Sequence, residues 1–151
     1  MDKMRLLSRL EKAWTELKDA FAGLDEAQLT QPGATSEWSV KDLLAHVATW
    51  DQEALHSLPM ILEGRRPPRY KDLYGGIDAF NALKSIEKQA LSLAETIEQF
   101  ERTHQSLVEM LLSLPEENFL RESRFLRRLR LDTYGHYPLH ARAIREWRRT
   151  L

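Results

Sequence analysis

Histidine is the residue type in this chain best suited to metal or nucleophilic chemistry. The 151 residues include five histidines and no cysteine, so no disulfide, thiolate metal site or protein thiol nucleophile is available. His136 and His140 are four residues apart, which places their side chains one turn apart on one face of a helix. Two imidazoles at this spacing can hold one zinc, nickel or iron ion, and a third ligand must then come from elsewhere in the chain.

His46 is the candidate for this third ligand. It lies between Leu43 and Trp50, at the margin of an apolar stripe that is expected to face the core. Three neutral histidines leave a coordination position open, where water or a substrate thiolate can bind. The alternative is that these histidines are ordinary core residues, since an i,i+4 pair also arises by chance. We expect His56, which lies close to Pro59, to be solvated.

His104 requires a separate interpretation. It occupies a position in an apolar stripe that an aliphatic residue would normally fill, and a buried imidazole needs a hydrogen-bond partner. The first interpretation is a polar core residue. The second is a residue that lines a pocket or supports the metal ligands.

Four amphipathic segments must position these histidines. Apolar residues recur at spacings of three and four in residues 7–24, 40–54, 83–114 and 136–151. We expect the third segment to be one continuous helix that ends at Pro115, and residues 65–76 to be a crossover without helical periodicity. Residues 119–131 are compatible with a short strand or a short helix. The pattern predicts an all-α four-helix bundle, one domain over residues 1–151, with a long connection between its second and third helices.

Several residues are expected to begin or interrupt these helices. Ser39, followed three residues later by Asp42, is typical of a capping box at the start of the second helix. Pro59 should kink or end that helix because it removes one backbone donor. Asp132 or Thr133 is expected to cap the last helix, whose inward stripe is predicted to be His136, His140, Ile144, Trp147 and Leu151.

The net charge of −1 conceals an asymmetry along the chain. From Arg121 onward nine arginines face three acidic residues, a net charge of +6, whereas the remainder has 13 basic and 20 acidic residues, a net charge of −7. Arginine favours carboxylate or phosphate recognition, so this end suits an anionic substrate or cosubstrate, or else forms a solvated face that pairs with the acidic helices. Nucleic acid is not expected as a partner, because aromatic residues do not interleave with the arginines and no helix-turn-helix pattern is present. With no signal peptide and no apolar stretch of membrane-spanning length, we expect a soluble, cytoplasmic protein.

Three stretches of the sequence resemble the DinB-like four-helix bundles, in particular their ClbS/DfsB branch. The first is the run WSVKDLLAHV from Trp38 to Val47, which is closed by Trp50. The others are the runs DAFN, residues 78–81, and YGHY, residues 134–137, the second of which continues to His140. Their order and spacing extend the resemblance over essentially the whole chain.

The resemblance implies a divalent metal held by one histidine of the second helix and two of the fourth. By matching position these ligands are His46, His136 and His140. Pro138, between the paired histidines, is a departure that can distort the turn aligning them. Some members of the branch work without a metal, so the resemblance also allows the histidines to serve only as polar groups of a pocket.

Further residues are candidates for the surroundings of this site. Asp42, one turn before His46, either caps its helix or hydrogen-bonds to that imidazole. Asn81 either binds a ligand or caps the start of the third helix. Three aromatic residues either line a cavity or belong to the ordinary core: Trp50, Tyr134 and Tyr137.

These observations support three hypotheses about function. The first is a metal-dependent transferase or hydrolase acting on a small electrophilic or thiol-linked molecule in a bundle cavity, with a metal that activates water or a substrate thiol. The second is a metal-free small-molecule binding or resistance protein of the ClbS/DfsB type. The third is a non-enzymatic interaction bundle, which forms a homodimer or uses its arginine-rich end. In the first hypothesis any reacting thiol comes with the substrate, because the chain has no cysteine.

Overall fold

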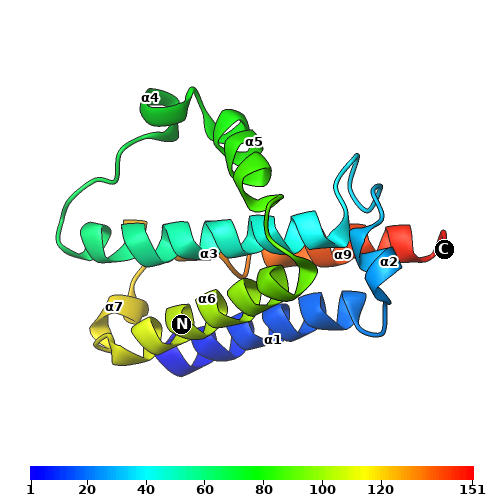
Figure 1. Cartoon of the computed structure of the whole chain (residues 1–151). Helices are drawn as coiled ribbons and strands as arrows, with labels where there is room; N and C mark the ends of the chain where they lie inside the picture. The colour runs from blue at the N-terminus through cyan, green and yellow to red at the C-terminus, as the bar shows by residue number, and fades with distance from the viewer.

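Four long helices form the body of the molecule. The computed structural model describes all 151 residues and contains helices and loops but no strand beyond a single bridge between Thr35 and Trp38. In Figure 1, α1 and α9 run in one direction and α3 and α6 in the other. The bounds of these four helices are α1 Lys3–Phe21, α3 Val40–Leu62, α6 Leu93–Ser113 and α9 Tyr137–Arg148. The predicted all-α four-helix bundle is confirmed.

Five shorter helices occupy the connections. The long connection between α3 and α6 carries α4 and α5, which rise from one side of the bundle and pack above α3 (Figure 1). The residues predicted as a crossover without periodicity therefore include one turn of helix. Residues 119–131 form no strand and contain the end of one short helix and most of another. The bounds are α2 Glu26–Thr30, α4 Tyr70–Tyr74, α5 Ile77–Lys88, α7 Glu117–Leu120 and α8 Arg124–Asp132. None of the helices is long and apolar enough to cross a bilayer.

The continuous helix predicted over residues 83–114 is wrong. The helix is interrupted between α5 and α6. Ser92 caps α6 there by accepting a hydrogen bond from the backbone N–H of Glu95. Leu83 and Ile86 are 41% and 67% exposed, so they do not belong to the core. The apolar spacing continues across this interruption by coincidence. The capping box of Ser92 and Glu95 is the local sequence signal that a new helix begins there.

The start of α9 also differs from the prediction. Asp132 is the last residue of α8, and a tight turn follows, so neither Asp132 nor Thr133 caps α9. Leu151 is 52% exposed, and His136 and His140 are only half-buried. The fully buried face of α9 is instead Tyr137, Ala141, Ile144 and Trp147. The predicted stripe was therefore displaced by one residue at its start, which moves the histidines to the rim of the core.

Pro59 does not end α3. The helix continues through Leu62, with Glu63 as its C-terminal cap. Because Pro59 lies in the last turns of the helix on an exposed position, it removes one backbone hydrogen bond without disturbing the buried face.

Gly135 allows the tight turn that places His136. A Cβ atom at this position would lie 2.7 Å from the carbonyl oxygen of Arg130, the same oxygen that accepts a hydrogen bond from the Gly135 N–H at 2.8 Å. Such a contact forces the backbone to shift, because the opposing atom belongs to the main chain.

We predict that Gly135→Ala lowers the free energy of unfolding by about 1–3 kcal/mol and displaces His136. Chemical denaturation measures the first effect, and the Cε1–H resonances of the histidines in NMR spectra measure the second. Gly33→Ala is the matched control, since Gly33 has a positive φ but open space at its Cβ position. That control should lose stability without moving the histidine resonances. Unchanged resonances in Gly135→Ala would contradict the role of this turn.

Candidate metal centre and adjoining cavity

The three histidines selected from the sequence meet between α3 and α9. The Nε2 atom of His136 lies 3.1 Å from Nε2 of His46 and 2.8 Å from Nε2 of His140. One ring nitrogen from each residue lies within 4.8 Å of the other two. His46 projects from the second turn of α3, and the other two come from adjacent turns at the start of α9. Residues 90 positions apart in the chain thus converge on one point.

Pro138 does not distort this arrangement. It lies in the first turn of α9, where a backbone N–H has no partner within the helix, so its missing donor carries no penalty. His136 is the N-terminal cap residue and already has helical backbone angles (φ −95°, ψ −46°). The i,i+4 relation to His140 is therefore preserved, although His136 itself lies just before the helix.

Burial keeps the imidazoles neutral. Burial first, and charge repulsion from the neighbouring histidines second, lower the pKa of His46 and of His136 to about 3. Burial alone lowers the pKa of His140 to about 4. Neutral imidazole is the form that binds a metal ion, so near neutral pH no proton has to be displaced from these rings.

The nitrogen positions fit a metal ion. Nitrogen ligands of a tetrahedral zinc ion, each about 2.0–2.1 Å from the metal, lie about 3.3 Å from one another, close to the two separations measured here. The three rings also turn Nε2 atoms toward one another, an arrangement in which neutral imidazoles can satisfy only part of their hydrogen-bonding capacity. His46, His136 and His140 are thus the residues that can hold a divalent metal, and the chemistry of three imidazoles suits zinc, nickel or iron.

A cavity of about 370 Å³ adjoins the histidines. Trp50 and Asn81 lie on its wall, one of the two positions considered for each, and they are joined by a hydrogen bond of 2.9 Å from Trp50 Nε1 to Asn81 Oδ1. Asn81 therefore does not cap α5, where it lies in the second turn. The full lining comprises His46, Trp50, Tyr70, Ile77, Asn81, Arg128, Leu131, Asp132 and His136.

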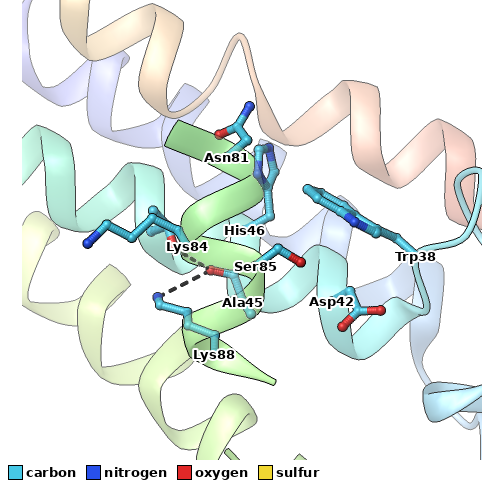
Figure 2. Close-up of a pocket in the computed structure, with 9 residues that line it drawn as sticks. Trp38, Asp42, Ala45, His46, Asn81, Lys84, Ser85 and Lys88 are labelled. Carbon is cyan, nitrogen blue, oxygen red and sulfur yellow. Dashed lines mark hydrogen bonds between the residues drawn. The ribbon is translucent and has the colours of Figure 1, made fainter. Parts of the chain in front are cut away.

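Asp42 caps α3 and makes no hydrogen bond to His46. Its Oδ2 accepts hydrogen bonds from the backbone N–H and the hydroxyl of Ser39, so the predicted capping box is present. Figure 2 shows Asp42 directed away from His46, whereas Asn81 lies beside the imidazole. The same view shows Lys88, at the end of α5, donating to the carbonyl of Ala45, which ties α5 to the turn of α3 that carries His46.

A polar network on the cavity wall was not anticipated as part of the site. The hydroxyl of Tyr70 donates to Glu53 Oε1 at 2.8 Å and accepts from Arg128 Nη2 at 2.6 Å. Arg128 Nε in turn donates to Asp132 Oδ2 at 2.7 Å. Burial raises the pKa of Asp132 to about 6, against the lowering effect of Arg128. The i,i+4 spacing of Arg128 and Asp132 could have indicated their ion pair from the sequence. Nothing in the sequence indicated that Tyr70 lies beside them.

His104 is a buried polar residue, as its first interpretation expected, and it belongs to a hydrogen-bonded chain that runs from the surface into the core, not to the cavity. Its Nε2 lies 2.8 Å from Glu11 Oε1, and its Nδ1 lies 3.3 Å from the hydroxyl of Tyr137. That hydroxyl donates to Asp51 Oδ1 at 2.7 Å. The imidazole also stacks on Trp14 with ring centroids 3.8 Å apart. Glu11, His104, Tyr137 and Asp51 come from α1, α6, α9 and α3, so this chain connects all four helices of the bundle.

Tyr134 and Tyr137 do not line the cavity. Tyr137 is fully buried in the polar chain, and Tyr134 is buried beneath the guanidinium of Arg9, 5.2 Å from its ring centroid. Asp51, which sequence reasoning missed, is completely buried, and this burial raises its pKa well above the usual range. Its Oδ2 has no hydrogen-bond partner. His56 is exposed, as expected.

Comparison with known proteins identifies the class defined by this bundle and its histidine cluster. Residues 9–143 match the family described as the DinB superfamily, and the chain belongs to it. No curated protein matches the sequence significantly.

Several solved structures share the fold over nearly their whole length. The chain is similar to the Sibling Lethal Factor Precursor DfsB (TM-score 0.82, 18% identity), covering 99% of this chain and 96% of that one. It is also similar to the colibactin self-resistance protein ClbS, solved with a dsDNA (TM-score 0.81, 13% identity, coverage 99% and 97%). A protein from Streptococcus pneumoniae gives a TM-score of 0.77 at 16% identity, with coverage of 99% and 91%. At these identities the similarity shows a common fold.

We predict that Tyr137→Phe lowers the free energy of unfolding by about 1–3 kcal/mol, because it leaves buried polar atoms of Asp51 and His104 without their partner. Tyr74→Phe is the matched control, since the hydroxyl of Tyr74 makes no hydrogen bond within the chain, and its effect should stay within about 0.5 kcal/mol. Urea denaturation measures both variants. Equal losses would show that the polar chain contributes nothing specific.

The buried histidines should also make the metal-free protein sensitive to acid. Their pKa values are lower in the folded state than the ordinary 6.5, so the unfolded state binds more protons and stability falls as the pH drops below about 6.5. Each such histidine costs up to about 2 kcal/mol at pH 5. Denaturation of metal-free wild type and His140→Gln at pH 7, 6 and 5 should give a shallower decline for the variant. Parallel declines would contradict the burial of a neutral His140.

Proposed function

We propose that this chain is a metal-dependent hydrolase or transferase acting on a small electrophilic or thiol-linked molecule. The observation that carries the proposal is the convergence of the Nε2 atoms of His46, His136 and His140 at the edge of a cavity large enough for such a molecule. Membership of the DinB superfamily and the resemblance to its ClbS/DfsB branch support the same ligand set.

Each group in the proposed site has a distinct role. The three imidazoles would hold the metal as neutral ligands, and two of them, His46 and His136, also line the cavity. When bound, the metal lowers the pKa of a water or a thiol and so supplies a nucleophile near neutral pH. Trp50 and Leu131 offer apolar surface to the substrate, and the Trp50–Asn81 hydrogen bond fixes the indole in place. A thiol, if one reacts, comes with the substrate, since the chain contains none.

A metal-free binding or resistance protein is the second candidate. The cavity of about 370 Å³ favours it, because its volume and mixed lining suit small-molecule binding whether or not a metal is present. Under this alternative, His46 and His136 act as polar groups of the cavity wall. Protection against a reactive compound would then survive loss of a histidine but not obstruction of the cavity.

The arginine-rich end fits a structural role better than nucleic-acid binding. Arg145 donates to the carbonyl of Glu16, and Arg148 donates to the carbonyls of Ala20 and Ala22, so both hold the end of α1. We therefore propose a small molecule as the partner. ClbS was solved with a dsDNA, yet the shared fold at 13% identity does not extend that partner to this chain.

Titration with Zn²⁺ and Co²⁺ tests the proposed metal site. Wild type should bind one equivalent, and His46→Ala, His136→Ala and His140→Ala should each weaken binding by about a hundredfold or more. Zinc at a hundred times its Kd should stabilise wild type by about 2.7 kcal/mol.

His56→Ala is the matched control, since His56 is exposed and outside the cluster, and it should bind like wild type. Binding that is weakened equally by His56→Ala, or absent from wild type, would eliminate the metal-dependent function and leave the metal-free candidate.

A further inference from the structure

Arg128 has an unused hydrogen-bonding edge on the cavity wall. Its Nε is bonded to Asp132 and its Nη2 to Tyr70, but Nη1 makes no hydrogen bond within the chain and is open to solvent. The side chain is 18% exposed and lines both the cavity beside the histidines and a second, shallower hollow. A guanidinium held in place by two partners, with a free edge, is preorganised to bind an anion.

The second hollow extends the cavity outward. It has a volume of about 580 Å³ and shares Tyr70, Ile77 and Arg128 with the first. Its lining also includes Arg69, Lys71 and Asp78. Taken together, the two hollows carry three basic and two acidic side chains, and Arg128 stands at their junction.

The cavity wall offers a second free donor besides Arg128 Nη1. The Oδ1 atom of Asn81 accepts from Trp50, which leaves the amide NH₂ of Asn81 without a partner in the chain. The Tyr70 hydroxyl is occupied on both sides by Glu53 and Arg128. An acceptor group of a ligand can therefore bond to Arg128 and Asn81, and an apolar body of the ligand can lie against Trp50 and Leu131.

We propose that the cavity binds an acidic amphiphile, a small molecule whose apolar body lies against Trp50 and Leu131 and whose carboxylate bonds to Arg128. This inference deepens the proposed function by naming its substrate class, and it rests on that function for the reaction but not for the binding. Asp132 is a positioning residue here, because it fixes the Nε edge of Arg128 and also offsets part of its charge.

The test compares 4-phenylbutyrate with its neutral isostere 4-phenylbutanamide. Titration calorimetry on metal-free, full-length protein should show the carboxylate binding at least about tenfold more tightly than the amide. Arg128→Gln should reduce the carboxylate affinity to that of the amide and leave the amide affinity unchanged. Asp132→Asn should raise the carboxylate affinity, because it removes the competing negative charge.

Arg127→Gln is the matched control, an exposed arginine on the same helix outside both hollows, and it should bind both probes like wild type. Arg128→Gln should lower the affinity for the carboxylate, and Asp132→Asn should raise it. Loss of folding would lower the affinity of both variants, so the two explanations are distinguishable. Equal affinity for the two probes, no saturable binding of either, or equal effects of Arg127→Gln and Arg128→Gln overturns the proposal. Because metal is absent from this assay, its outcome is independent of the zinc titration.

Discussion

The hydrogen bond between Tyr137 and Asp51 joins α9 to α3 inside the bundle, and the candidate site depends on it. At 2.7 Å between two fully buried side chains, it leaves little freedom in how the start of α9 meets α3. His136 immediately precedes Tyr137, and His46 lies on α3 five residues before Asp51. His104, which is buried, and Glu11, which is exposed at the surface, extend the same chain to α6 and α1, so one polar network links all four helices.

The long connection between α3 and α6 completes the site. Phe80 of α5 is fully buried against the rings of Trp50, Tyr70 and Tyr74, with centroids 4.9–5.3 Å away. This aromatic contact holds α4 and α5 over α3 and closes one side of the cavity, while the Tyr70–Arg128 hydrogen bond fastens the same segment to α8. The bundle thus supplies the histidines, and the connection supplies much of the wall around them.

The four-helix bundle and the candidate histidines could be predicted from the sequence because both show in local periodicity. An i,i+4 spacing and an apolar stripe are properties of one helix, so His136, His140 and the capping box at Ser39 could be read without knowing the fold. The hydrogen-bond partners of His104 could not be predicted in this way, since Glu11 and Tyr137 are brought to it by tertiary packing. The same holds for Tyr70, whose role depends on how the connection folds back. The prediction of one continuous helix over residues 83–114 failed because apolar spacing alone does not show where one helix ends and the next begins.

The central claim is that His46, His136 and His140 together hold one divalent metal ion. X-ray absorption spectroscopy of the zinc-loaded wild type tests it most directly, because the method counts imidazole ligands and measures their distances. We predict three imidazole nitrogens at about 2.0–2.1 Å from the zinc and an additional oxygen ligand. A spectrum with fewer than three imidazoles, or with oxygen ligands alone, would contradict it.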